Sequence, residues 1–122
     1  MKGSKYGTHR VIKNIGDLPQ PAEKIDNSME IYDNEILIDV KTLNIDSASF
    51  TQIKEEAGGE EKEIAKIMQR IVDNRGKHHN PVTGSGGMLV GVVEEIGEDL
   101  KGEIDLEVGD EIATLVSLSL TP

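Results

Sequence analysis

Two adjacent histidines are the residues of this chain best suited to proton transfer. His78 and His79 have ordinary pKa values near neutrality, so they are candidates for a catalytic base or a proton relay. They lie in the segment 77–87, where glycines and polar residues without periodicity indicate a loop that approaches something closely. A metal site is the weaker alternative, because neighbouring histidines seldom point the same way and the chain has no cysteine. Loop hydrogen bonding or substrate contact is therefore favoured.

A second polar segment covers residues 44–50 and follows an expected strand. Its small polar side chains suit a loop or the start of a helix better than a strand. A structural role is slightly favoured for this segment, in which Asp46 or Ser47 caps a short helical turn through Phe50 and Ile53.

Two motifs that would assign a reaction are absent from the sequence. The run Gly84-Ser85-Gly86 begins like a dinucleotide fingerprint, but Leu89 takes the place of its third glycine and a strand is expected to follow instead of a helix. Neither Ser85 nor Ser47 stands in a G-x-S-x-G elbow, so the sequence does not support a serine hydrolase.

The elements that would position these residues are mostly expected to be strands. The β-branched apolar run 88–93 predicts a buried strand, and Gly91 inside it indicates a bulge, a barrel corner or a close approach of another backbone. A turn at 108–110 leads into a returning strand at 111–116. The alternation of apolar and polar residues in 35–43 predicts a half-buried strand.

One clear helix is expected, over residues 60–75. Apolar residues recur there at helical spacing, and they are Ile64, Ile67, Met68, Ile71 and Val72. Gly76 fits the C-terminal cap of this helix. Prolines and glycines in residues 1–34 indicate extended segments and turns, with possible short strands at 11–12 and 29–32.

Length and composition limit the class of protein. A chain of 122 residues has room for one domain with a single core. Its 23 acidic and 13 basic residues give a net charge of −10, which repels phosphate backbones and anionic lipid, so nucleic acid is not an expected partner. No apolar run is long enough to span a bilayer and no signal region follows the first residues, so we expect a soluble, cytoplasmic protein.

The glycine-punctuated pattern between residues 84 and 115 resembles the GroES-like barrel domain of the medium-chain dehydrogenase/reductase superfamily. The resemblance rests on Gly86, Gly91, Val92, Val93, Ile96, Gly97, Val108, Gly109, Asp110, Ile112 and Ala113. It implies a mainly β fold with one clear helix, in which residues 1–122 form a GroES-like partly open β-barrel. Many members of the superfamily hold a catalytic zinc. Here Gly87 and Met88 stand in place of its His and Glu motif residues, and Asn44 lies near the place of a cysteine, so zinc is not expected.

Longer stretches of the chain resemble one group within this superfamily. The runs KYGTHRVI, LPQPA, LNIDSASFTQI and KHHNPVTGSGGML together look like the amino-terminal part of the dehydrogenases that act on a diamino acid in lysine fermentation. These enzymes are longer. The resemblance implies that residues 1–122 are the substrate and catalytic domain, and that a Rossmann domain for NAD follows in the parent chain.

The reaction implied by this resemblance is an oxidative deamination. Hydride passes from a carbon bearing an amino group to NAD, and the imine is then hydrolysed. His78 or His79 would act as the base or relay the proton, and Asp46 would hold an ammonium group of the substrate. Four further residues would orient the amino group or the hydrolytic water, and they are Asn44, Ser47, Ser49 and Ser85. The fragment alone is expected to be inactive.

Two other functions fit the same pattern of residues. One is a free-standing GroES-like module for binding or assembly, and the other is a fragment of a zinc-free, quinone-type reductase. The sequence leaves open the choice between NAD and NADP, and it leaves open a homo-oligomer of the full-length form.

Overall fold

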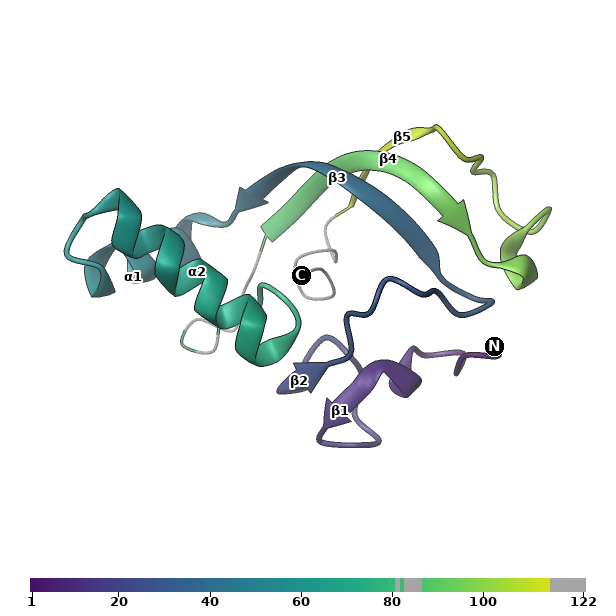
Figure 1. Cartoon of the computed structure of the whole chain (residues 1–122), viewed down its shortest axis with the longest axis horizontal. Coiled ribbons are helices and arrows are strands. Elements are labelled where there is room, and N and C mark those ends of the chain that lie inside the picture. Colours follow the sequence, from purple (N-terminus) through teal and green to yellow (C-terminus); the bar gives the residue numbers. More distant parts are fainter. Residues whose placement is uncertain (81, 83–86, 115–122) are drawn as a thin grey trace.

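The structure is a computed structural model that describes residues 1–80, 82 and 87–114. Its main sheet has three antiparallel strands. β3 (Ile36–Ile45) pairs with β4 (Gly87–Ile96), and β4 pairs with β5 (Glu111–Thr114). Figure 1 shows β3 and β4 as a long arched ribbon, with the helices at one end and β1 and β2 below the arch, near the end of α2.

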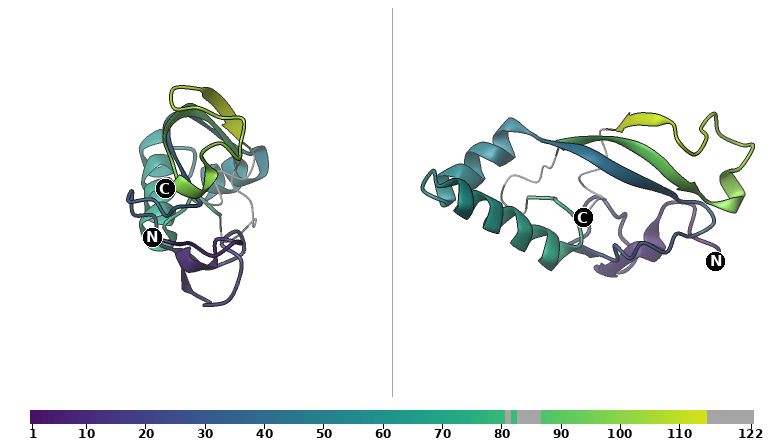
Figure 2. Two further views of the ribbon diagram at one scale, coloured as in Figure 1. Left: turned by 90° about the vertical axis from the view of Figure 1, so that its right-hand side faces the viewer. Right: turned by 45° about the horizontal axis from the view of Figure 1, so that its top comes forward.

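Two α-helices pack against each other beyond the end of β3. They are α1 (Ser47–Glu56) and α2 (Glu61–Arg75), which lie side by side in the right-hand view of Figure 2 and share a buried cluster of isoleucines. That cluster consists of Ile53, Ile64, Ile67 and Ile71. The α2 helix ends at Gly76, whose φ of 74° is the left-handed conformation that glycine adopts at low cost.

The amino-terminal segment forms a small sheet of its own. A short 3-10 helix, η1 (Thr8–Arg10), leads into β1 (Val11–Lys13), which pairs with β2 (Lys24–Ile25). A second 3-10 helix, η2 (Glu98–Leu100), follows β4. The small sheet has a separate buried cluster formed by Val11, Ala22 and Ile25.

Several predicted elements are confirmed. The strand predicted at 35–43 is β3, with Ile38 and Val40 half-buried and Asp39 exposed between them. β4 and the long helix also lie where the sequence placed them. The strand predicted at 111–116 is confirmed as far as Thr114, because Leu115 and Val116 lie outside the described residues.

The predicted mainly β fold with one helix is wrong in part. The described residues contain two α-helices, because the turn expected after Asp46 continues to Glu56 as α1. Asn44 and Ile45, expected to begin a loop, extend β3 and pair with Met88 and Gly87. The described residues form two separate antiparallel sheets and no closed barrel, so the partly open GroES-like barrel stays a prediction.

No strand forms at 29–32. The backbone of this region serves another purpose, because the carbonyl oxygens of Ser28 and Glu30 accept hydrogen bonds from the Arg10 side chain. The short strand β2 was not predicted, since two residues carry too little periodicity to be detected.

Gly91 lies where β3 and β4 approach closely. A Cβ atom at this position would lie 2.7 Å from both the Asp39 carbonyl oxygen and the Ile38 Cγ2 atom. Its partner Val40 stands beside an irregularity in the register, between Val40 and Thr42. Gly91 was predicted to mark a bulge or a close approach of another backbone. It lies beside an irregularity in the register and also at a close approach of β3.

Candidate active site at the start of α1

The first turn of α1 is fixed by the side chain of Asp46. The extended backbone of Asp46 (φ −64°, ψ 153°) places its Oδ1 atom 3.2 Å from the Ser49 backbone nitrogen, which donates a hydrogen bond to it. The predicted capping role of Asp46 is thus confirmed. The cap leaves the second carboxylate oxygen with no other described hydrogen bond, so this oxygen can accept one from a ligand.

The loop after α2, which begins at Lys77 and contains both histidines, is held on one side by the Lys77 and Arg75 side chains. The Lys77 ammonium is fully buried and donates to the carbonyl oxygens of Pro19 (2.5 Å) and Gln20 (2.7 Å). The Arg75 guanidinium donates to the carbonyl oxygens of Glu23 and His79. Both cations tie the loop to the segment that precedes β2.

Asn80 anchors the other side of the loop to α1. Its Nδ2 atom donates to Ser49 Oγ at 3.1 Å and to Gln52 Oε1 at 2.9 Å. Its Oδ1 atom accepts from the Val82 backbone nitrogen at 2.9 Å. Asn80 and Ser49 are 1% and 0% exposed, so this is a buried connection between loop and helix.

His78 lies between these anchors with an unusual environment. Its side chain is 3% exposed, and neither ring nitrogen has a hydrogen-bond partner among the described residues. Burial lowers the pKa of His78 below its ordinary value of 6.5, while the nearby His78 backbone and, to a smaller extent, the negative charge of Asp46 act in the opposite direction. The ring is therefore held neutral near pH 7, and a neutral imidazole has one nitrogen able to accept a proton.

The structure brings together some of the predicted site residues and separates others. Ser49 is joined to the loop that holds His78 and His79 by the hydrogen bond from the Asn80 side chain. Ser47 and Asn44 are exposed, the latter on β3 opposite Met88. These two residues make no described contact with the histidine loop.

His79 and Ser85 complete the predicted set. His79 is half-buried, and its carbonyl oxygen accepts a hydrogen bond of 2.6 Å from Arg75. Ser85 lies outside the described residues. Asn80 was not predicted, although an asparagine directly after two histidines and before a proline is a signal for a side chain that binds loop backbone.

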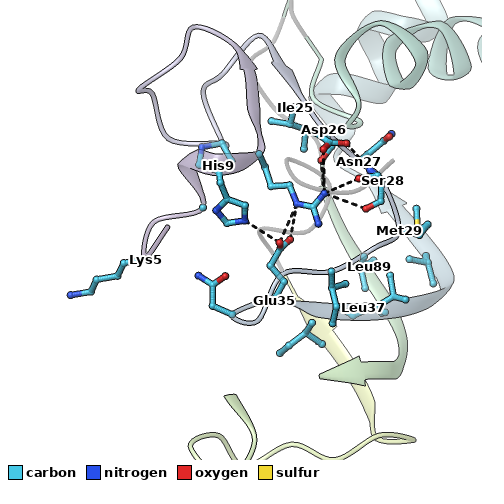
Figure 3. Close-up of a pocket in the computed structure, with 18 residues that line it drawn as sticks. Lys5, His9, Ile25, Asp26, Asn27, Ser28, Met29, Glu35, Leu37 and Leu89 are labelled. Atoms are coloured by element: carbon cyan, nitrogen blue, oxygen red, sulfur yellow. Dashed lines mark hydrogen bonds and ion pairs between the residues drawn. The ribbon is translucent and has the colours of Figure 1, made fainter. Parts of the chain in front are cut away.

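A hollow of about 360 Å³ lies between the amino-terminal segment and β3. Figure 3 shows the Glu35 carboxylate in this hollow, bonded to the His9 ring. The Arg10 Nε atom donates to both Glu35 oxygens, at 3.1 and 2.9 Å, and its two Nη atoms donate to Asp26, Ser28 and Glu30 oxygen atoms.

The charged side chains in this hollow bind one another. Burial would raise the pKa of Glu35, but the hydrogen bonds from Arg10 and His9 and the Arg10 charge outweigh burial and lower it. The Arg10 guanidinium also lies 4.9 Å from the centre of the Tyr32 ring. Because every Arg10 nitrogen already has a partner, we interpret this cluster as a brace between the amino-terminal segment and β3.

The helix starts do not suit a dinucleotide. A pyrophosphate is commonly bound at a helix N-terminus, where backbone N–H groups and the helix dipole favour negative charge. Asp46 occupies the start of α1, and Glu60, Glu61 and Glu63 occupy the start of α2. These carboxylates repel phosphate, so neither α-helix start in the described residues suits a pyrophosphate.

The described residues offer neither a metal-binding group of side chains nor a membrane-spanning helix. No group of three His, Asp or Glu side chains in residues 1–80, 82 and 87–114 could hold a metal ion. Within the same residues, none of the helices has the length and apolar character needed to cross a membrane.

Comparison with known proteins identifies the family. The family described as L-erythro-3,5-diaminohexanoate dehydrogenase N-terminal domain matches residues 9–122. The chain belongs to this family. Two curated relatives carry the name L-erythro-3,5-diaminohexanoate dehydrogenase. The chain is 70% identical over all 122 residues to the protein of Acetoanaerobium sticklandii and 69% identical over 121 residues to that of Fusobacterium nucleatum subsp. nucleatum.

The chain matches only part of each diaminohexanoate dehydrogenase. The two matches cover 100% and 99% of this chain, but only 36% and 35% of the length of the relatives. The chain thus spans about a third of the length of the curated relatives.

Proposed function

We propose that this chain is the amino-terminal domain of an enzyme that oxidatively deaminates L-erythro-3,5-diaminohexanoate to 5-amino-3-oxohexanoate and ammonium. The observation that carries the proposal is the 70% identity over the whole chain to a protein named for this substrate. Since that match covers 36% of the relative, activity requires the remainder of the enzyme. NAD is the expected electron acceptor, bound mainly outside these 122 residues.

In this proposal His78 is the base. The substrate amine is an ammonium ion near pH 7, and it must lose a proton before its carbon can give up hydride. A buried, neutral imidazole with no described hydrogen-bond partner is available to take that proton. Loss of hydride then leaves an iminium ion, to which water adds, and ammonium leaves as the ketone forms.

Asp46 supplies the charge that attracts the ammonium group. Its carboxylate is half-buried at the start of α1 and acts on His78 electrostatically. A charge-assisted hydrogen bond to this carboxylate would hold the substrate beside the imidazole. The polar residues Asn44, Ser47, Ser49, His79 and Ser85 remain candidates for orienting the amino group or the water.

Steady-state kinetics of the full-length enzyme test this function. We expect NAD reduction with L-erythro-3,5-diaminohexanoate and release of ammonium in equal amounts. A quinone offered with reduced cofactor is the control for the quinone-type reductase, and we expect no turnover. Turnover of the quinone without turnover of the diamino acid would overturn the proposal.

A binding measurement tests the assignment of NAD to the rest of the enzyme. Calorimetric titration of NAD into the 122-residue chain should show no tight binding, because carboxylates occupy both α-helix starts. Tight binding would contradict the proposal that NAD is bound mainly outside these 122 residues.

A further inference from the structure

The orientation of the His78 ring depends on how its loop is anchored. Because neither ring nitrogen has a hydrogen-bond partner among the described residues, no side-chain bond fixes the imidazole. The neighbouring backbone must do so. Lys77 and Arg75 hold the loop before and after the histidine by binding carbonyl oxygens.

Only one described anchor of the loop reaches α1, the helix that carries Asp46. The Asn80 side chain makes two hydrogen bonds to α1 residues, Ser49 and Gln52, and a third to the Val82 backbone. All of these bonds start from a side chain that is 1% exposed, where water competes little for them. The distance between loop and helix is thus set at Asn80.

We infer that Asn80 is a positioning residue that fixes His78 against the start of α1. The inference rests on the proposed function of His78 as the base. Asn80 does not touch the reacting atoms in this scheme. It acts by bonding the loop that carries the imidazole to α1, the helix that Asp46 caps, and so keeps the imidazole buried and in a fixed position.

Chemical labelling of the full-length protein tests the positioning without measuring activity. Diethyl pyrocarbonate acylates accessible neutral imidazoles, and tandem mass spectrometry distinguishes His78 from His79. We expect His78 to be protected in the wild type and labelled at least about tenfold faster in Asn80→Ala, since loosening the loop admits solvent. Equal protection in both proteins would overturn the inference.

Kinetics with the diamino acid test whether positioning serves the reaction. In Asn80→Ala we expect kcat to fall on the order of 10- to 100-fold with KM changed by less than about threefold, because misplacing a base slows chemistry more than binding. Gln52→Leu, which removes one acceptor of Asn80, should lower kcat in the same direction but less. The double variant should resemble Asn80→Ala alone.

A stability control separates positioning from general loosening. Val11→Ala weakens the buried cluster of the small sheet and leaves the described anchors of the loop in place. It should reduce thermal stability while kcat stays near the wild-type value. If Val11→Ala lowers kcat as much as Asn80→Ala at equal stability loss, Asn80 is structural only. A wild-type enzyme with no turnover of the diamino acid would refute the proposed function, while the labelling result would still decide the positioning.

Discussion

Arg10 and His78 are both buried basic side chains, yet their polar atoms have opposite environments. Every nitrogen of the Arg10 side chain donates a hydrogen bond. Neither nitrogen of His78 has a partner among the described residues. Burying a polar group without a partner costs free energy. The burial of His78 is therefore unfavourable, whereas the hydrogen bonds of Arg10 offset the cost of burying its side chain. Such an exception is common at functional sites.

Arg10→Met should destabilise the protein by about 3 kcal/mol. The variant keeps an apolar stem but leaves Glu35 partly buried without its main cation, and it leaves the carbonyl oxygens of Ser28 and Glu30 unpaired. Chemical denaturation measures the loss. Arg10→Lys is the matched control, which keeps the charge but not the planar fork, and it should lose less. Equal stability of Arg10→Met and wild type would contradict the brace.

The role of a single residue could be predicted from the sequence where that role depends on residues close to it in the chain. Asp46 could be identified as a helix cap because the capping bond spans only three residues. The Arg10 to Glu35 pair spans 25 residues and the Asn80 to Ser49 bond spans 31, so no local pattern indicates either. Both were found only when the fold had placed their elements side by side.

At the scale of elements, β3 and α1 form one continuous unit. β3 runs to Ile45, Asp46 turns the backbone, and α1 begins at Ser47. This abrupt change places the capping carboxylate at the end of a strand, where side chains are held firmly. The same strand pairs closely with β4 at Gly91, so the position of Asp46 depends on the β3 to β4 register.

Gly91→Ala should destabilise the sheet by about 1–3 kcal/mol. The added Cβ atom would meet the Asp39 carbonyl oxygen and the Ile38 side chain at 2.7 Å, so the strands must separate. Thermal unfolding of the variant measures the cost. Gly102→Ala is a contrasting variant, since its Cβ meets nothing within 4 Å and only its φ of 80° opposes the change. A fully stable Gly91→Ala would show that the strands are not in close contact.

The predictability of the elements follows from their periodicity. α2 has a five-residue apolar stripe and was predicted nearly to its ends. α1 contains one fully buried apolar residue, Ile53, and depends on its cap and on packing against α2. Such a helix has too short an apolar pattern to be recognised in full, which explains why only a short helical turn through Ile53 was predicted.

At the scale of the molecule, the end of α2 joins the helices to the amino-terminal segment. Lys77 and Arg75 bind carbonyl oxygens at residues 19–23, more than fifty residues earlier in the chain. Burial, with a smaller contribution from the Arg75 charge, lowers the pKa of Lys77 to about 8. The connection therefore carries a pH dependence.

Lys77→Met should change how stability depends on alkaline pH. A lysine whose pKa is 10.5 when unfolded and about 8 when folded binds fewer protons in the folded state between these values. Stability from this group therefore rises from about pH 8 to 10.5, by at most about 1.4 kcal/mol per pH unit. Denaturant unfolding over this range should show the rise in wild type relative to Lys77→Met. Parallel curves would contradict the assignment.

The variant should also lose stability at pH 7. It removes two hydrogen bonds and leaves the carbonyl oxygens of Pro19 and Gln20 without their donor, a loss of about 1–3 kcal/mol. The sequence did not indicate this role for Lys77, because its acceptors lie 57 and 58 residues away. Long-range connections of this kind are what the sequence could not show, in contrast to strands and helix ends.

The central claim is that His78 is the base for the oxidation of an amine. The direct measurement is kcat of the full-length enzyme with L-erythro-3,5-diaminohexanoate and NAD, compared between wild type and His78→Gln at matched folded fraction. The account predicts that kcat falls about 10²- to 10⁴-fold in His78→Gln, while His79→Gln falls less. Unchanged kcat in His78→Gln would contradict it.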